Sequence, residues 1–529
     1  MRTVKKVYVL LAALVAMGAM PLTAATKAEA ATVQSSTVID VTDYGADGSD
    51  SSGDSEAIQD ALDEAIGSSS VVTVKIPSGT YYIDKGLKLY SNTYLKLTSK
   101  TILYRTDSAS GANILHCVDQ NGERDIVGGY SQCHDVTIDG GIWNGGNVAK
   151  TKDNTDVVRI DHAKNVVIKN ATFKNVYDCH LLELVAVKNG TVSNCSFSGF
   201  VYNVKHKNQV EYGREAVQIE SAWTNNPKNL SDLDSAWASG SKIDGTSCKN
   251  IVVTGCTFKD YPICVGQHHT STSSKYKNSK GITISNNTIT AGSKYTYFKT
   301  AISCGGLDSV TISNNYVKGP YQYGTNIYEG KDISVKNNTF ISNRRNSINV
   351  FDDAKITVIS GNTIKSAGKH AISLTKCTVG TKKSAKKGIL NNTIKNSKQN
   401  GICISKGVKV YFIKGNKISG CKAHGISNVG SATIGTKSVK KSGIQSNTIQ
   451  SCKKNGISIA GASVSYIKSN KITSVKNNAI SMTKGKIYQI IKNKIKKARI
   501  GIFVYSKSKV TKGVKKNSIS KCTYPTVIR

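Results

Sequence analysis

An asparagine recurs at nearly constant intervals through the second half of the chain, and this recurrence restricts the fold more than any other feature. Counted from Asn287, the second Asn of each Asn-x-Ile-like unit returns after 28, 23, 24, 30, 24, 31, 23, 23 and 24 residues, ending at Asn517. The period is therefore 23 or 24 residues, with about seven residues inserted at three coils. Such a period is typical of a solenoid in which each repeat packs only on its neighbours.

Short segments between these asparagines alternate apolar and polar residues, as in Ile282-Thr283-Ile284 and Ile333-Ser334-Val335. This alternation indicates β-strands in which every second side chain faces inward. Strands this short cannot bury a face alone, but when stacked about 4.8 Å apart they form long parallel sheets around one core. We therefore predict an all-β fold, a right-handed parallel β-helix with one short capping helix at its N-terminal end.

The repeated asparagine has a structural explanation. We expect it at the sharp turn between two strands, where Asn tolerates the left-handed backbone conformation and its amide hydrogen-bonds the equivalent Asn one coil away. His370 and His424 stand where other coils carry Asn, and we interpret them as turn residues.

The capping helix is predicted from residues 57–66, where apolar side chains share one helical face behind Asp54 or Ser55 as N-cap. Its apolar face would cover the first coil, because the open end of a β-helix exposes core and strand edges.

Residues 1–30 have the pattern of a secretory signal, with a basic start, an apolar run and a small-residue cleavage site. No other apolar stretch approaches the roughly 20 residues that a membrane-spanning helix needs. We therefore expect a secreted, soluble monomer. Its solenoid is divided into residues 31–353, which hold the candidate site, and residues 354–529, which continue as lysine-rich repeats.

The charge is concentrated in those last repeats. Residues 354–529 contain 37 lysine and arginine residues and no aspartate or glutamate, whereas the preceding residues are almost neutral. One interpretation is a lysine face that only keeps the protein soluble. The other is a surface that binds an acidic polysaccharide or a cell-wall polymer. Nucleic acid is not expected as a partner of an exported protein.

The 13 cysteines include no zinc-type Cys-x-x-Cys pair, and several fall at recurring coil positions. We predict that most are small apolar core residues, with disulfides as the alternative. No metal ligand and no cofactor are predicted.

Four segments near the N-terminus occur in a characteristic order, and they are residues 40–46, 74–82, 89–95 and 137–145. This order resembles the N-terminal coils of the pectate-lyase-like superfamily, which includes polygalacturonases, pectate lyases, some epimerases and phage tailspikes. The resemblance implies a right-handed β-helix with a carbohydrate ligand in a groove on one side.

The polygalacturonase motifs themselves are incomplete, which favours a remoter branch of the superfamily. Tyr261-Pro262 stands where the resemblance implies a pair of aspartates, and the Arg-Ile-Lys motif is absent. The first polygalacturonase motif is Asn-Thr-Asp. Asn154-Thr155-Asp156 matches it but falls too early in the coil order, and we interpret it as a chance match.

The least repetitive segment, about residues 155–270, holds most of the unusual polar residues. Strand alternation places several of them on outward positions of neighbouring strands. The catalytic candidates are Glu183, Glu215, Glu220 and His268. The substrate-binding candidates are Arg159, Asp161, His180, Gln218, Trp223 and His269.

Three functions follow from these residues. Clustered carboxylates with separated pKa values suit a glycoside hydrolase, the function that we favour. A polysaccharide lyase acting on a uronate-containing glycan is the second, with Ca²⁺ held by carboxylates. The third is a non-catalytic adhesive or wall-binding rod, which we expect if the carboxylates are scattered or buried with local partners.

Overall fold

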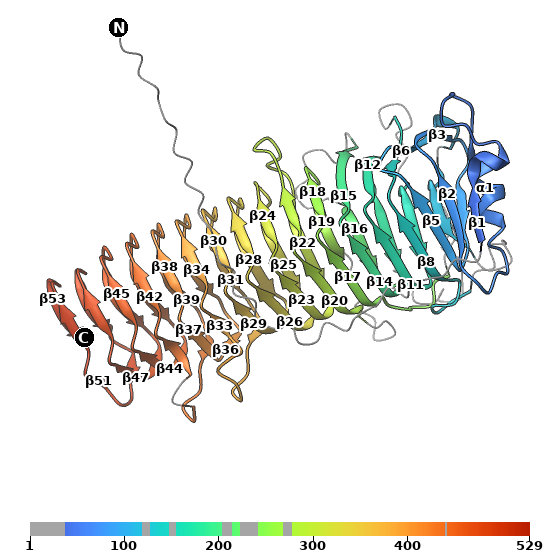
Figure 1. Cartoon of the computed structure of the whole chain (residues 1–529). Coiled ribbons are helices and arrows are strands. Elements are labelled where there is room, and N and C mark those ends of the chain that lie inside the picture. Colours follow the sequence, from blue (N-terminus) through green and yellow to red (C-terminus); the bar gives the residue numbers. More distant parts are fainter. Residues whose placement is uncertain are drawn as a thin grey trace, which may run out of the picture.

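The computed structural model describes residues 37–109, 111–118, 127–147, 155–203, 214–222, 242–267, 278–439 and 442–529. In these residues the chain winds into one long stack of coils (Figure 1). The coils form three sheets, two with 16 described strands and one with 21. The predicted parallel β-helix is confirmed. The secretory signal expected in residues 1–30 lies outside the described residues.

Each regular coil contributes one strand to each sheet. One coil consists of β23 (Asp308–Ser313), β24 (Tyr316–Lys318) and β25 (Tyr323–Tyr328). β23 pairs in parallel with β26 (Lys331–Lys336), which begins 23 residues later, so the sequence period is the length of one coil. The stack continues past residue 354 with β29 (Lys355–Ser360). The division after residue 353 stays a prediction that rests on charge.

The repeated asparagines form a continuous ladder inside the stack. The side-chain amide of each one donates to Oδ1 of the next over 2.9–3.0 Å, from Asn287 to Asn517. Most of these amides also donate to a main-chain carbonyl, as Asn392 does to Ile359 over 3.0 Å. The expected hydrogen bonding from coil to coil is confirmed, and it satisfies polar groups that would otherwise be buried without partners.

The expectation that the ladder asparagine itself takes the left-handed conformation is wrong. The residue before it does so: φ is 57° at Asn286, 56° at Asn314 and 54° at Asn391. Gly361 and Gly415 occupy the same position in other coils, with φ of 67° and 71°. The turn residue bends the chain from a strand of one sheet into a strand of the next, and the following asparagine then points its amide inward.

His370 and His424 lie in turns, as predicted. Nδ1 of His370 accepts a hydrogen bond from the main-chain N–H of Asn400 over 3.3 Å, and Nδ1 of His424 accepts one from Asn455 over 3.1 Å. Burial, together with a neighbouring lysine charge, lowers the pKa of each imidazole to about 4. Both rings are therefore neutral acceptors at pH 7.

Helix α1 (Ser55–Asp63) lies at the N-terminal end of the stack (Figure 1). Its apolar side chains Ile58, Ala61 and Leu62 are buried, so the predicted cap is confirmed. Asp54 is the N-cap residue, but its carboxylate accepts from the main-chain N–H groups of Tyr82 and Asp47 instead of the helix. Among the described residues, no helix has the length and apolar character that crossing a bilayer requires.

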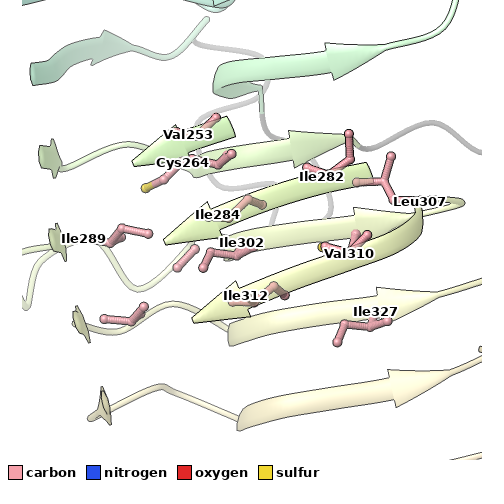
Figure 2. Close-up of a cluster of buried hydrophobic side chains, with 14 of the residues drawn as sticks. Val253, Cys264, Ile282, Ile284, Ile289, Ile302, Leu307, Val310, Ile312 and Ile327 are labelled. Atoms are coloured by element: carbon pink, nitrogen blue, oxygen red, sulfur yellow. The ribbon is translucent and has the colours of Figure 1, made fainter. Parts of the chain in front are cut away.

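Aliphatic side chains from the three sheets fill the interior, as Ile284, Ile302 and Ile312 do in Figure 2. Aromatic rings also stack from coil to coil, with ring centroids 5.2 Å apart for Phe173 and Phe197. All 13 cysteines are free thiols, and all but Cys522 are buried. Their interpretation as core residues is confirmed.

Candidate active site

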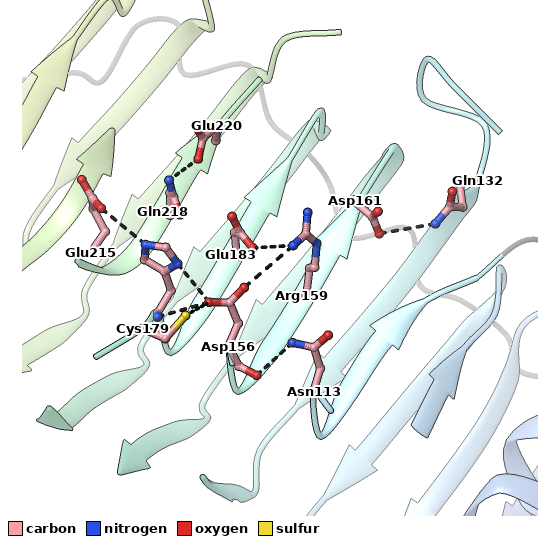
Figure 3. A network of polar contacts seen from close by, with 11 residues as sticks. Asn113, Gln132, Asp156, Arg159, Asp161, Cys179, Glu183, Glu215, Gln218 and Glu220 are labelled. Atoms are coloured by element: carbon pink, nitrogen blue, oxygen red, sulfur yellow. Dashed lines mark hydrogen bonds and ion pairs between the residues drawn. The ribbon is translucent and has the colours of Figure 1, made fainter. Parts of the chain in front are cut away.

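A row of polar side chains crosses three consecutive strands of one sheet. The strands are β10 (Val158–Asp161), β13 (Leu182–Val185) and β16 (Glu215–Glu220). The register aligns Arg159 with Glu183, and Glu183 with Gln218 (Figure 3). The positions between them belong to the apolar core, so the alternation predicted from the sequence is confirmed for this row.

This row is buried, not open to solvent. Arg159, Glu183 and Gln218 are 3%, 4% and 1% exposed. Nη1 of Arg159 lies 3.1 Å from Oε2 of Glu183, so the guanidinium and the carboxyl group are local partners. Burial with local partners is also the arrangement that we expected of a non-catalytic rod.

Asp156 is the centre of the polar network, although the sequence led us to treat it as a chance match. Oδ1 of Asp156 lies 2.9 Å from Nδ1 of His180 and 2.8 Å from Sγ of Cys179. Its Oδ2 lies 4.0 Å from Nη1 of Arg159. Asp156 was missed because it lies two residues before β10, outside the strand on which the alternation was counted. The signal that could have found it was its spacing of 24 residues from His180.

The remaining candidates extend the network along the same wall. Oε2 of Glu215 lies 3.6 Å from Nε2 of His180. Glu220 accepts a hydrogen bond from Nε2 of Gln218. Asp161 accepts one from Nε2 of Gln132 over 3.4 Å. These residues are no more than 6% exposed, so the structure places seven of the ten predicted site residues together, buried, on adjacent strands of one sheet.

The three other predicted site residues, Trp223, His268 and His269, lie outside the described residues. Their roles stay predictions.

The two carboxyl groups at the centre of the network have opposite pKa shifts. Burial raises the pKa of Glu183 well above its usual range, and Asp156 adds to the shift, whereas Arg159 opposes it. Burial also acts to raise the pKa of Asp156, but its hydrogen bonds with Glu183 and His180 and the charges of His180 and Arg159 outweigh burial. The pKa of Asp156 is therefore well below its usual range.

His180 completes the electrostatics of the pair. Burial acts to lower the pKa of its imidazole, but the charge of Asp156 and the hydrogen bond to it raise that pKa well above its ordinary value. Within one network, therefore, the pKa of Glu183 is raised, that of Asp156 is lowered and that of His180 is raised. Neighbouring carboxyl groups whose pKa values are shifted in opposite directions are the arrangement that acid–base catalysis uses.

A metal ion is a second chemical option for part of this network. Asp156, Cys179 and His180 each offer one ligand atom, and these atoms lie within 4.8 Å of one another. A carboxylate, a thiolate and an imidazole form a donor set that suits Zn²⁺. In this structure Cys179 and His180 each hydrogen-bond Oδ1 of Asp156 directly.

Two family models match the chain. Residues 38–258 match the family described as "Rhamnogalacturonase A/epimerase, pectate lyase-like", and this range includes the whole polar network. Residues 206–360 and 268–405 match the family described as "Right handed beta helix region".

Two curated proteins are similar to parts of the chain. Plasmin and fibronectin-binding protein A of Streptococcus pneumoniae is 31% identical over 195 residues, which are 35% of this chain and 27% of that protein. Iota-carrageenase of Alteromonas macleodii is 29% identical over 189 residues, which are 34% of this chain and 36% of that protein. The chain thus spans about a third or less of the length of these relatives.

Solved structures are similar at low identity. The surface adhesin PfbA of Streptococcus pneumoniae is 20% identical, with a TM-score of 0.48 and coverage of 83% of this chain and 90% of that one. A family 28 exopolygalacturonase of Yersinia enterocolitica is 12% identical, with a TM-score of 0.41 and coverage of 88% and 78%.

Proposed function

The chain belongs to the pectate-lyase-like superfamily of right-handed parallel β-helices, and from this premise we propose that it is an extracellular glycoside hydrolase acting on a polysaccharide. The observation that carries the proposal is the pair Glu183 and Asp156, whose pKa values are shifted in opposite directions within one network. Fold alone does not determine activity in a superfamily with several chemistries, so the proposal rests on this site.

Each member of the pair has a role in hydrolysis. Protonated Glu183 donates its proton to the glycosidic oxygen as the general acid. Ionised Asp156 activates a water molecule or attacks the sugar carbon, as the second carboxylate of a glycosidase does. His180 and Arg159 keep Asp156 ionised, through contacts of 2.9 Å and 4.0 Å. Glu215, Glu220 and Gln218 position these groups, and His268 is proposed to assist proton transfer.

The names of the relatives agree with this class of activity. The family model that covers the network carries rhamnogalacturonase in its description, and one relative is named iota-carrageenase. We propose a polymer with acidic groups as the substrate, because the basic coils after residue 354 would attract it.

The test is incubation of the purified chain with a panel of neutral, uronate-containing and sulfated polysaccharides. We expect new reducing ends from at least one polymer, without the ultraviolet absorbance of unsaturated uronates. Glu183→Gln and Asp156→Asn should each lower kcat by a factor of about 100 or more, since each removes one acid–base partner. Glu329→Gln is the matched control, because Glu329 is exposed and lies outside the network.

Other outcomes of the panel contradict hydrolysis. Unsaturated products that disappear with a chelator would identify a Ca²⁺-dependent lyase instead. Full activity in Glu183→Gln would exclude Glu183 as the acid, and full activity in Glu220→Gln would exclude Glu220 from the chemistry.

A non-catalytic adhesive rod is the second candidate, and one observation favours it: the carboxylates of the network are buried with local partners. One relative is also named for binding plasmin and fibronectin. Binding of a polymer from the panel without any product would support this function over hydrolysis.

A further inference from the structure

A groove of about 570 Å³ crosses the lysine-rich coils on a different sheet from the polar network. It lies over β36 (Val408–Val410), β40 (Ala432–Ile434), β44 (Ser463–Lys468), β47 (Lys486–Ile491) and β50 (Lys509–Val510). These strands pair with one another in this order, and β36, β44 and β47 are labelled in the lower part of Figure 1.

One row of exposed side chains runs along this groove in strict register. The aligned residues on the five strands are Lys409, Thr433, Ser463, Lys486 and Lys509. Successive positions are about 4.8 Å apart, the spacing of stacked strands. The row therefore presents cations at both ends and hydroxyl groups between them.

Two loops bring further positive charge to the groove. Lys382 lies between β32 (Thr378–Val379) and β33 (Ile389–Leu390), and Lys437 follows β40. Both loops are insertions that lengthen the regular period, at the repeat spacings of 30 and 31 residues. Residues 354–529 contain no acidic side chain, so the five lysines of the groove have no carboxylate from these coils to neutralise them. A cluster of lysine ammonium groups without neighbouring carboxylates favours the binding of an anionic ligand.

A second row gives the groove its shape. Tyr411 and Tyr488 line it three coils apart, about 14 Å along the stack. The two intervening coils have the small residues Gly435 and Ser465 at this position. The floor of the groove is therefore lower between the two tyrosine rings than at the rings themselves. Tyrosine rings and hydroxyl groups are the surfaces on which sugar rings stack and hydrogen-bond.

We propose that this groove binds a linear acidic polysaccharide, whose carboxylate or sulfate groups pair with the lysines while its sugar rings contact Tyr411 and Tyr488. The ligand lies along the stack, because the lysine row and the two tyrosines both follow that direction. The site is separate from the network of β10, β13 and β16, and it binds whether or not that network is catalytic.

The test compares two triple variants of the full chain that lose the same charge. Lys409→Gln/Lys486→Gln/Lys509→Gln removes the groove cations, whereas Lys365→Gln/Lys395→Gln/Lys496→Gln removes exposed lysines of another sheet. Binding is measured by fluorescence anisotropy with a labelled oligogalacturonate, a labelled sulfated oligosaccharide and a neutral dextran oligomer. The recovered oligosaccharides are examined to verify that they stay intact.

The wild-type chain should bind the uronate or the sulfated oligosaccharide, and the stronger of the two identifies the acidic group. The groove variant should bind it about tenfold more weakly or worse, and the control variant less than about threefold more weakly. Tyr488→Ala should also weaken binding, while Tyr505→Ala, at an exposed tyrosine outside the groove, should not.

Four results would overturn the proposal. They are binding to none of the acidic oligosaccharides, equal binding of the neutral dextran, equal losses in the two triple variants, and equally tight, groove-dependent binding of single-stranded DNA. Thermal melting followed by circular dichroism verifies that both variants are folded. If the groove variant does not fold, Lys486→Gln against Lys496→Gln makes the same comparison with single substitutions.

Discussion

Arg159 and Glu183 occupy aligned positions on adjacent coils, with Nη1 and Oε2 3.1 Å apart and both side chains almost completely buried. This contact therefore joins two turns of the solenoid at a place where water does not screen it. Its removal affects both the stability of this wall and the charge state of the carboxyl groups beside it.

Replacement of Arg159 by methionine should destabilise the chain strongly. Arg159→Met removes the buried guanidinium beside Glu183 and Asp156, and breaking one side of a buried pair costs about 3–5 kcal/mol. Denaturant titration followed by circular dichroism measures the loss. Lys169→Met is the control, since the pair of Lys169 with Asp139 is partly exposed and should contribute about 1 kcal/mol or less. Equal effects of the two substitutions would contradict the structural importance of the buried pair.

The network should make stability depend on pH in two directions. The lowered pKa of Asp156 stabilises the fold above the ordinary carboxyl pKa of about 4, and this contribution is lost as pH falls toward the folded value. The raised pKa of His180 stabilises the fold fully below about pH 6.5, and this contribution is lost as pH rises through the folded value.

Denaturation midpoints measured from pH 3 to pH 9 test this dependence. The difference between wild type and Asp156→Asn should shrink toward acid, and the difference between wild type and His180→Gln should shrink toward alkali. His370 and His424, with pKa values near 4, add an acid sensitivity of their own, but it is common to all three proteins and cancels in the differences. Differences that do not change with pH would contradict the shifted pKa values.

A single ladder asparagine should contribute more to the free energy of unfolding than the turn residue that precedes it. Asn392 accepts from the main-chain and side-chain N–H groups of Asn362 over 3.0 and 2.9 Å, and it donates to Asn416 and Ile359. Asn392→Ala leaves several buried polar groups unpaired and should cost about 2–4 kcal/mol.

The matched control for this substitution is Asn391→Gly. Asn391 is exposed and has φ of 54°, a conformation that glycine adopts freely, so its replacement should change stability by a few tenths of a kcal/mol. Denaturant titration of both variants makes the comparison. A cost for Asn391→Gly that matched that of Asn392→Ala would mean that the turn, not the ladder, holds adjacent coils together.

The cysteines should all react with a thiol reagent when the protein is unfolded in denaturant to which no reductant has been added. All 13 are free in the structure, so titration with a thiol reagent in denaturant should approach 13 groups per chain. Few should react in the native protein, since burial raises the pKa of most of them, for example that of Cys248 to about 12. A lower count in denaturant would indicate disulfides between stacked cysteines, such as Cys195 and Cys256, which contact each other on adjacent coils.

The repeat allowed the fold to be predicted because residues that are one period apart in the sequence lie next to each other on adjacent coils. All ten ladder positions were identified from Asn287 to Asn517, and the apolar alternation gave the orientation of Glu183 and Gln218. The backbone conformation was assigned to the wrong asparagine, since a sequence pattern does not distinguish which of two adjacent residues makes the turn.

The site was harder to predict for a physical reason. Strand alternation says which side chains point away from the core, but not whether other parts of the chain then bury them, and Arg159 and Glu183 are buried. Asp156 was discarded because it precedes its strand, yet residues just before a strand also align from coil to coil, as Asp156 and His180 do.

The asparagine ladder has a consequence for how such a molecule changes over time. Its amide-to-amide bonds lie inside the stack, and they pass unbroken beside the insertions that contain Lys382 and Lys437. Loops can therefore lengthen, shorten or exchange their charges on the outside of a coil while the internal connection stays the same. Such a protein can change the binding specificity of its surface one coil at a time while it keeps the same fold.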